Sequence, residues 1–245
     1  MRAQQPMSRQ RALVLLALGV AGVYLLVRRE VIGTESLLIL LALVPSVILH
    51  EVSHGAMALV FGDDTARDAG RLTLNPVRHV DPLGTVVLPA MLVLAGAPPF
   101  GYAKPVPVNP RKLRNPRDHG LVVSLVGPGV NIVIAVAAAL VLRFLGGEAG
   151  VFGLYTSFDD LPFSHQLLYV LGYINVVLAA FNLIPIPPLD GSAVIERLLP
   201  ARWWPGYLRL RQYSMVVLLV LVLALPELLS RVFGPAIDLW ERLLV

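Results

Sequence analysis

The chain has 245 residues, of which 56% are hydrophobic and only 15% are charged, and its mean hydropathy is +0.73. A soluble domain carries about 25% charged residues, so the composition excludes an ordinary soluble protein and predicts an α-helical polytopic membrane protein. The net charge of +4 is typical of basic cytoplasmic loops and gives no reason to expect a nucleic-acid partner. The absence of cysteine excludes disulfides and thiolate metal sites.

Long apolar runs predict five membrane-spanning helices, in chain order at residues 12–27, 36–61, 120–142, 166–190 and 213–230. The first run follows three arginines, as a signal peptide would. The residues after it lack a small-x-small cleavage pattern, so a retained helix is predicted. A sixth apolar stretch, 86–97, has 12 residues and would reach only about 18 Å as a helix. It is predicted to be re-entrant or interfacial, which gives five to six helices in all.

The distribution of Lys and Arg predicts a cytoplasmic N-terminus. If the five spans alternate in direction, the cytoplasmic pieces are 1–11, 62–119 and 191–212. These pieces carry 15 of the 20 Lys and Arg residues, as the positive-inside rule requires. The chain is therefore expected to be a multi-pass protein of the cell membrane.

Two segments between the second and third spans are predicted to be extended. Residues 71–76 alternate polar and apolar side chains and end in proline, and residues 102–110 contain too many prolines for a helix. A small membrane-associated β-structure is expected there. A substrate strand could pair with either segment.

The sequence His50-Glu51-Val52-Ser53-His54 lies inside the second apolar run. Two histidines four residues apart lie on one face of a helix and are typical ligands for one metal ion. A glutamate beside the first histidine can take a proton from a water at the metal. Ionisable groups inside a membrane span are candidates for function, since burying them there is costly.

A catalytic zinc needs a third protein ligand, and Asp190 is the candidate. The alternating topology places the end of the fourth span, with Asp190, on the same side of the membrane as His54. Three prolines at 185, 187 and 188 break the helix before it, and broken helices at membrane depth line polar cavities. The alternative is a simple helix-ending Asp-Gly turn.

These motifs resemble the site-2 protease family of intramembrane zinc metalloproteases. The resemblance rests on His50 to His54 and on Asn182-Leu-Ile-Pro-Ile-Pro-Pro-Leu-Asp-Gly191. Three further segments agree, Gly70 to Thr85, Gly101 to Pro110 and Gly127-Pro-Gly-Val-Asn131. The resemblance covers residues 36–195. The chain is similar to the compact members of the family, because neither a PDZ nor a CBS domain is recognised in this sequence. The resemblance implies one Zn²⁺ held by His50, His54 and Asp190, with Glu51 as the base.

Other polar residues leave alternatives open. Asn131, in an apolar run, could stabilise the oxyanion of the reaction or form hydrogen bonds between helices. Asn182 could bind the substrate backbone or cap the broken helix. Asn175 is expected to contribute to helix packing, and His79 to stabilise its loop or act as a pH-sensitive gate.

The predicted function is hydrolysis of a peptide bond in or near a transmembrane segment of a membrane-protein substrate. The resemblance implies a partner, an upstream site-1-type protease that trims the substrate first. Two alternatives are an inactive relative that binds transmembrane helices and a divalent-metal transporter. The expected organisation is an N-terminal helix and connection (1–35), a protease core (36–195) and a C-terminal helix and tail (196–245).

Overall fold

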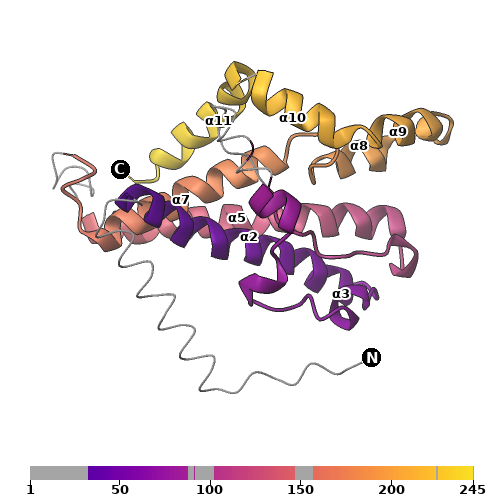
Figure 1. Ribbon diagram of the computed structural model, residues 1–245, viewed down its shortest axis with the longest axis horizontal. Helices are drawn as coiled ribbons and strands as arrows, with labels where there is room; N and C mark the ends of the chain where they lie inside the picture. Colours follow the sequence, from indigo (N-terminus) through magenta and orange to yellow (C-terminus); the bar gives the residue numbers. More distant parts are fainter. Residues whose placement is uncertain (1–32, 88–90, 92–101, 147–156, 225, 245) are drawn as a thin grey trace. The chain divides into compact units, whose positions relative to one another are not determined.

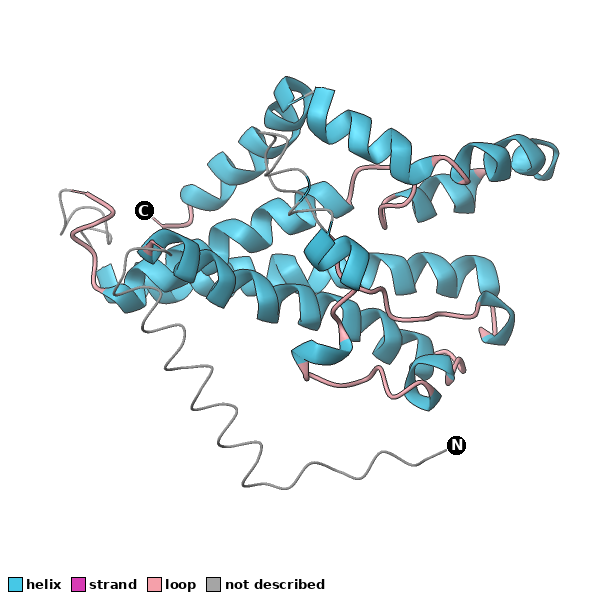
Figure 2. Cartoon of the chain, in the orientation of Figure 1, coloured by secondary structure: helices cyan, strands magenta, loops and turns pink. Residues whose placement is uncertain are grey.

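The computed structural model describes residues 33–87, 91, 102–146, 157–224 and 226–244. Within these ranges the backbone is helical or irregular, and no strand occurs (Figures 1 and 2). Residues from Leu41 onward form one compact unit, to which the contacts below belong. The predicted span 12–27 and most of the 86–97 stretch fall outside the described ranges.

Three described helices are long and apolar enough to cross a membrane: α2 (Thr34–Val60), α5 (Pro116–Gly146) and α7 (Phe163–Asn182). At 1.5 Å per residue they are about 40, 46 and 30 Å long, which matches or exceeds a hydrocarbon core of about 30 Å. These helices overlap the second, third and fourth predicted spans, and their length and composition are those of a multi-pass membrane protein.

The outer surface of α5 is strongly apolar. Phe144 is 85% exposed and Val133 is 68% exposed within the isolated chain. Such a surface is typical of a helix in contact with lipid, because exposing apolar side chains to lipid carries no free-energy cost.

Helix α7 ends at Asn182, eight residues before the predicted end of its span. The prolines that follow lack an N–H group and cannot continue the helix. The chain instead turns from Leu183 to Gly191 before α8 (Ser192–Leu198), η5 (Ala201–Trp203) and α9 (Trp204–Arg211). This turn carries Asp190.

The predicted single span over 213–230 is divided into two helices, α10 (Ser214–Ala224) and α11 (Pro226–Glu241). Their axes differ by 81°, and Pro226 is a residue type that starts a helix readily but does not continue one. The described residues therefore contain three candidate spans, or four if this bent pair counts as one.

Helices α5, α7 and α11 share an apolar core. The indole of Trp240 is buried and donates a 2.8 Å hydrogen bond to the carbonyl of Ala135. A Cβ at Gly172 would lie 2.2 Å from Cζ2 of Trp240, so only glycine lets α7 approach the indole this closely. The core fixes α5 against α7, the two helices that flank the polar site described below.

The region between α2 and α5 corrects the prediction of β-structure. Its described helical elements are α3 (Thr65–Asp68), η1 (Pro76–Arg78), η2 (Pro82–Val87) and η3 (Pro110–Lys112). Residues 71–75 and 102–109 are irregular rather than paired as strands. Prolines remove N–H groups that a ladder would need, and side chains bind several of the remaining backbone groups.

Candidate metal centre

Helix α2 presents His50 and His54 on one face, as the four-residue spacing predicts. Both side chains are buried, with 6% and 8% of each residue exposed. The rings are nearly perpendicular, with centroids 4.7 Å apart, and the two Nε2 atoms lie 3.1 Å apart. The two imidazoles therefore aim at one point.

The carboxylate of Asp190 lies at the same point. Its Oδ2 atom is 3.0 Å from Nε2 of His50 and 3.4 Å from Nε2 of His54. This oxygen is buried and has no hydrogen-bond donor among the described residues. Residues 140 positions apart in the sequence thus share one site, which the two parallel spans predicted.

Gly191 makes the turn at Asp190 possible. Its N–H donates a 2.6 Å hydrogen bond to the carbonyl of Asn182, which closes the turn back onto the end of α7. A Cβ at this position would lie only 2.2 Å from the carbonyl oxygen of Leu183. The Asp-Gly pair therefore combines a ligand with the one residue type that fits beside it.

A chain of buried hydrogen bonds fixes which nitrogen of His50 faces Asp190. Asn175 donates from Nδ2 to the carbonyl of Leu171 (2.8 Å) and to Oγ of Ser46 (2.7 Å), so its Oδ1 accepts. Asn131 donates to that Oδ1 (2.7 Å), which leaves its own Oδ1 to accept from Nδ1 of His50 (2.6 Å). His50 therefore carries its proton on Nδ1.

His54 has the same tautomer for a simpler reason. Its Nδ1 lies 2.6 Å from the carbonyl oxygen of Val123, which can only accept a hydrogen bond. In the neutral imidazole the Nε2 atom then has a free lone pair. Each of the two histidines is thus oriented by a partner on α5.

In their neutral forms the two imidazoles both turn an Nε2 lone pair toward the carboxylate oxygen of Asp190. Two Nε2 lone pairs and one carboxylate oxygen repel at 3.0–3.4 Å unless a cation lies among them. A tetrahedral zinc with ligand bonds of about 2.0–2.1 Å separates its ligand atoms by about 3.3 Å. The residues present therefore fit a zinc ion.

Helix α5 leaves room for that ion at Gly127. A Cβ there would lie 2.5 Å from Nε2 of His54 and 2.7 Å from Cε1 of His50. At Gly129, two residues further along α5, an added Cβ would face open space. The Gly-Pro-Gly sequence thus contains one glycine in direct contact with the histidines and one that is not.

Glu51 lies beside the cluster on α2, and its Oε2 accepts a 2.8 Å hydrogen bond from the N–H of Val106. Asn182 lies at the end of α7, where its side chain donates to the carbonyl of Leu178. His79 is buried in the 71–79 loop and contacts the carbonyl of Thr73.

Asn175 contributes to helix packing as predicted, through hydrogen bonds to Asn131 on α5 and Ser46 on α2. Two contacts near the candidate site were not predicted. One is the part of Ser46 in this chain of bonds, although a polar residue inside an apolar span is itself a signal. The contact between Val106 and Glu51 gives no such signal in the sequence, because every residue except proline carries the same backbone N–H.

A buried site whose residues fit a metal ion, within candidate membrane-spanning helices and with a glutamate next to the first histidine, is typical of a membrane-embedded metallopeptidase. The model of peptidase family M50 matches residues 148–225, which include Asp190. A relative named "Putative zinc metalloprotease YwhC" from Bacillus subtilis is 38% identical over 185 residues, 75% of this chain and 78% of the relative.

Two further relatives agree. "Putative zinc metalloprotease Rip2" from Mycobacterium tuberculosis is 32% identical over 193 residues, covering 77% of this chain and 67% of that protein. "Zinc metalloprotease MJ0392" from Methanocaldococcus jannaschii is 30% identical over 94 residues, 38% of this chain and 23% of its own length. No solved structure matches the chain. The chain belongs to peptidase family M50, the site-2 protease family of intramembrane zinc proteases.

Proposed function

We propose that the chain is an active endopeptidase in which His50, His54 and Asp190 hold one zinc ion and Glu51 is the general base. The observation that carries this proposal is the meeting of Nε2 of His50, Nε2 of His54 and Oδ2 of Asp190 within 3.0–3.4 Å of one another. Bound zinc supplies a Lewis acid that polarises the scissile carbonyl and acidifies a water molecule.

Glu51 performs the proton transfers in this proposal. Its carboxylate takes a proton from the attacking water and returns it to the amine that leaves. One carboxylate oxygen is held by the N–H of Val106, so the other is available for the water. The substrate is a membrane protein cut in or near a transmembrane segment, as the family implies.

Asn131 is proposed to orient His50 rather than to stabilise the oxyanion. Its Oδ1 accepts from His50 and its Nδ2 donates to Asn175, so both ends of the amide are engaged. Such outer partners typically change metal affinity 10- to 100-fold. Asn182 is proposed to shape the turn that carries Asp190, because its carbonyl accepts from Gly191.

The active site is proposed to open toward the cytoplasm, on the side of the N-terminus. The charge bias supports this orientation, with 15 of 20 Lys and Arg in the three segments assigned to that side. Residues 36–195 are proposed as the protease core, with 1–35 and 196–245 as flanking segments. An upstream site-1-type protease is proposed to trim the substrate first.

The two alternatives are not favoured. A metal transporter needs several sites along a path, whereas one group of His and acidic residues in the described ranges could hold a metal, and it is His50, His54 and Asp190. A relative that only binds helices would have no use for Glu51.

The test is cleavage of tagged single-span substrates in liposomes. Native protein and Glu51→Gln are reconstituted side by side, with and without a zinc chelator. Product from native protein alone, lost on chelation, is expected. Equal product from Glu51→Gln would overturn the assignment of the base.

A further inference from the structure

Residues 104–109 form an extended segment that is held along its length. The N–H of Lys104 donates to the carbonyl of His79 (2.9 Å), and the carbonyl of Lys104 accepts from the guanidinium of Arg71 (2.6 Å). Arg71 is 7% exposed, so this clamp is buried. At the other end the N–H of Asn109 donates to Oδ2 of Asp63 (2.6 Å).

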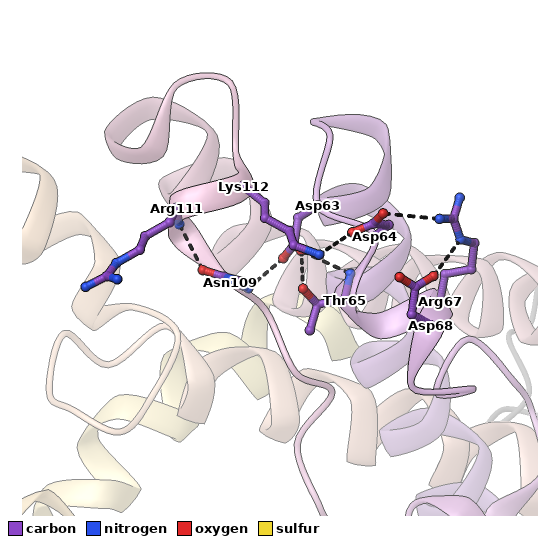
Figure 3. A network of polar contacts seen from close by, with 8 residues as sticks. All are labelled: Asp63, Asp64, Thr65, Arg67, Asp68, Asn109, Arg111 and Lys112. Carbon is purple, nitrogen blue, oxygen red and sulfur yellow. Dashed lines mark hydrogen bonds and ion pairs between the residues drawn. The ribbon is translucent and has the colours of Figure 1, made fainter.

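Asp63 is a strong anchor for this segment (Figure 3). Its residue is fully buried, and its Oδ1 accepts from both the N–H and the hydroxyl of Thr65. Burial alone would raise the pKa of this carboxyl, but the hydrogen bonds from Thr65 and Asn109 outweigh it and hold the pKa below its usual range. The anchor therefore stays ionised at neutral pH.

Prolines determine which backbone groups the segment can offer. Pro105 and Pro107 have no N–H, so Lys104, Val106, Val108 and Asn109 are the donors that remain. The N–H groups of Lys104, Val106 and Asn109 are taken by His79, Glu51 and Asp63. Only Val108 keeps an N–H without a partner among the described residues, so the segment has one backbone donor left for a substrate strand.

Val106 lies tightly against α2 at the level of Glu51. It is 7% exposed, and a Cβ on Gly55, one turn after Glu51, would lie 2.7 Å from Cγ1 of Val106. Gly55 therefore lets the segment come close enough for the 2.8 Å bond from Val106 N–H to Glu51 Oε2. Backbone N–H groups donated to a carboxylate make strong, directional hydrogen bonds.

We infer that the N–H of Val106 is a positioning group for Glu51, and that the 104–109 segment exists to hold that N–H in place. This inference rests on the proposed role of Glu51 as the base. The bond engages Oε2 and removes the rotational freedom of a long side chain, so that Oε1 is directed to the water. The segment acts on the rate of the reaction, not on zinc or substrate binding.

The main experiment compares three variants in the liposome assay. Val106→Pro removes the N–H, Val106→Ala trims the side chain but keeps the N–H, and Val108→Pro removes an N–H that binds no described residue. Val106→Pro is expected to lower kcat about tenfold or more, with KM and zinc content unchanged. Val108→Pro is expected to stay near the native kcat, and Val106→Ala, which keeps the N–H, is expected to lose less kcat than Val106→Pro. A native kcat in Val106→Pro would overturn the inference.

A second measurement does not depend on activity or on proline. Hydrogen exchange is followed by mass spectrometry in a peptide that covers residues 102–113. Glu51→Ala removes the acceptor of the Val106 N–H. In this variant the peptide is expected to contain one more fast-exchanging amide than in native protein. Glu51→Gln keeps an acceptor oxygen and should resemble native protein. Unchanged exchange in Glu51→Ala would overturn the inference even if Val106→Pro fails to fold.

The two readouts also separate the inference from the proposed function. Native protein that cleaves no substrate would argue against the proposed function, while hydrogen exchange would still test the contact between Val106 and Glu51. Normal cleavage by Val106→Pro, with loss of cleavage in Glu51→Gln, would remove the inference alone.

Discussion

Nδ1 of His50 and Oδ1 of Asn131 lie 2.6 Å apart, and this contact fixes the nitrogen that His50 turns toward Asp190. The direction of this bond follows from the carbonyl of Leu171, which can only accept a hydrogen bond. Asn175 therefore turns its Nδ2 toward Leu171 and its Oδ1 toward Asn131. A ligand tautomer on α2 is thus controlled by a backbone group on α7.

The first prediction concerns this hydrogen-bond chain. Asn175→Leu removes the acceptor of Asn131 and frees its amide to rotate, so zinc affinity is expected to fall about 10- to 100-fold. The measurement is competition with a chelator of known affinity. Asn182→Leu on the same helix is the comparison, because its side chain bonds to Leu178 and the backbone carbonyl that accepts from Gly191 is kept, and its zinc affinity should fall less than that of Asn175→Leu. Equal losses in both variants would contradict a specific role of Asn175.

The second prediction concerns the close approach of α5. Gly127→Ala places a methyl group 2.5 Å from Nε2 of His54. Overpacking costs about 1–3 kcal/mol, which corresponds to roughly 5- to 150-fold weaker zinc binding. Gly129→Ala is a matched control, since no other atom lies within 4 Å of its added Cβ. It is expected to bind zinc normally and to be slightly more stable, as alanine favours a helix.

The third prediction separates metal binding from chemistry. Asp190→Ala is expected to lose both stoichiometric zinc and cleavage, because two neutral histidines hold zinc weakly. Glu51→Gln is expected to keep zinc and lose cleavage by at least about 100-fold. Zinc content by atomic emission and product by gel give the two readouts. Full zinc in Asp190→Ala would show that this carboxylate is not a ligand.

The fourth prediction concerns acid stability. The pKa of Asp63 is lowered in the folded protein by hydrogen bonds from Thr65 and Asn109, which outweigh its burial. Because the pKa of Asp63 is lower in the folded protein than in the unfolded chain, its carboxylate stabilises the fold at pH values above the unfolded pKa of 3.8. This stabilisation is lost as the pH falls through the folded pKa.

Thermal unfolding measured from pH 7 down to pH 3 tests this dependence. Native protein is expected to lose more Tm below pH 4 than Asp63→Asn, which has no proton to gain at this position. Asp68→Asn, at an exposed acidic residue near Asp63, is the control for removing one charge. Parallel Tm curves for native protein and Asp63→Asn would contradict the stabilising role of the carboxylate.

The sequence predicted which residues meet in the candidate site better than it predicted their surroundings. His50 and His54 follow from helical spacing, and Asp190 follows from the direction of two spans. The roles of Ser46 and Asn175 depend on how three helices pack, which no local pattern specifies. The expected β-structure failed because the same prolines that make 102–109 extended also remove the N–H groups a ladder requires.

The hydrogen-bond chain from Ser46 through Asn175 and Asn131 has a consequence for assembly. Ser46 and His50 lie on α2, Asn131 on α5, Asn175 on α7 and Asp190 just beyond α7. Neither the ligand set nor its orienting partners are complete until these three helices have come together. Zinc binding at the proposed site would therefore be thermodynamically linked to helix association in the bilayer. Free metal should favour the assembled bundle, and its removal should loosen the contacts among α2, α5 and α7.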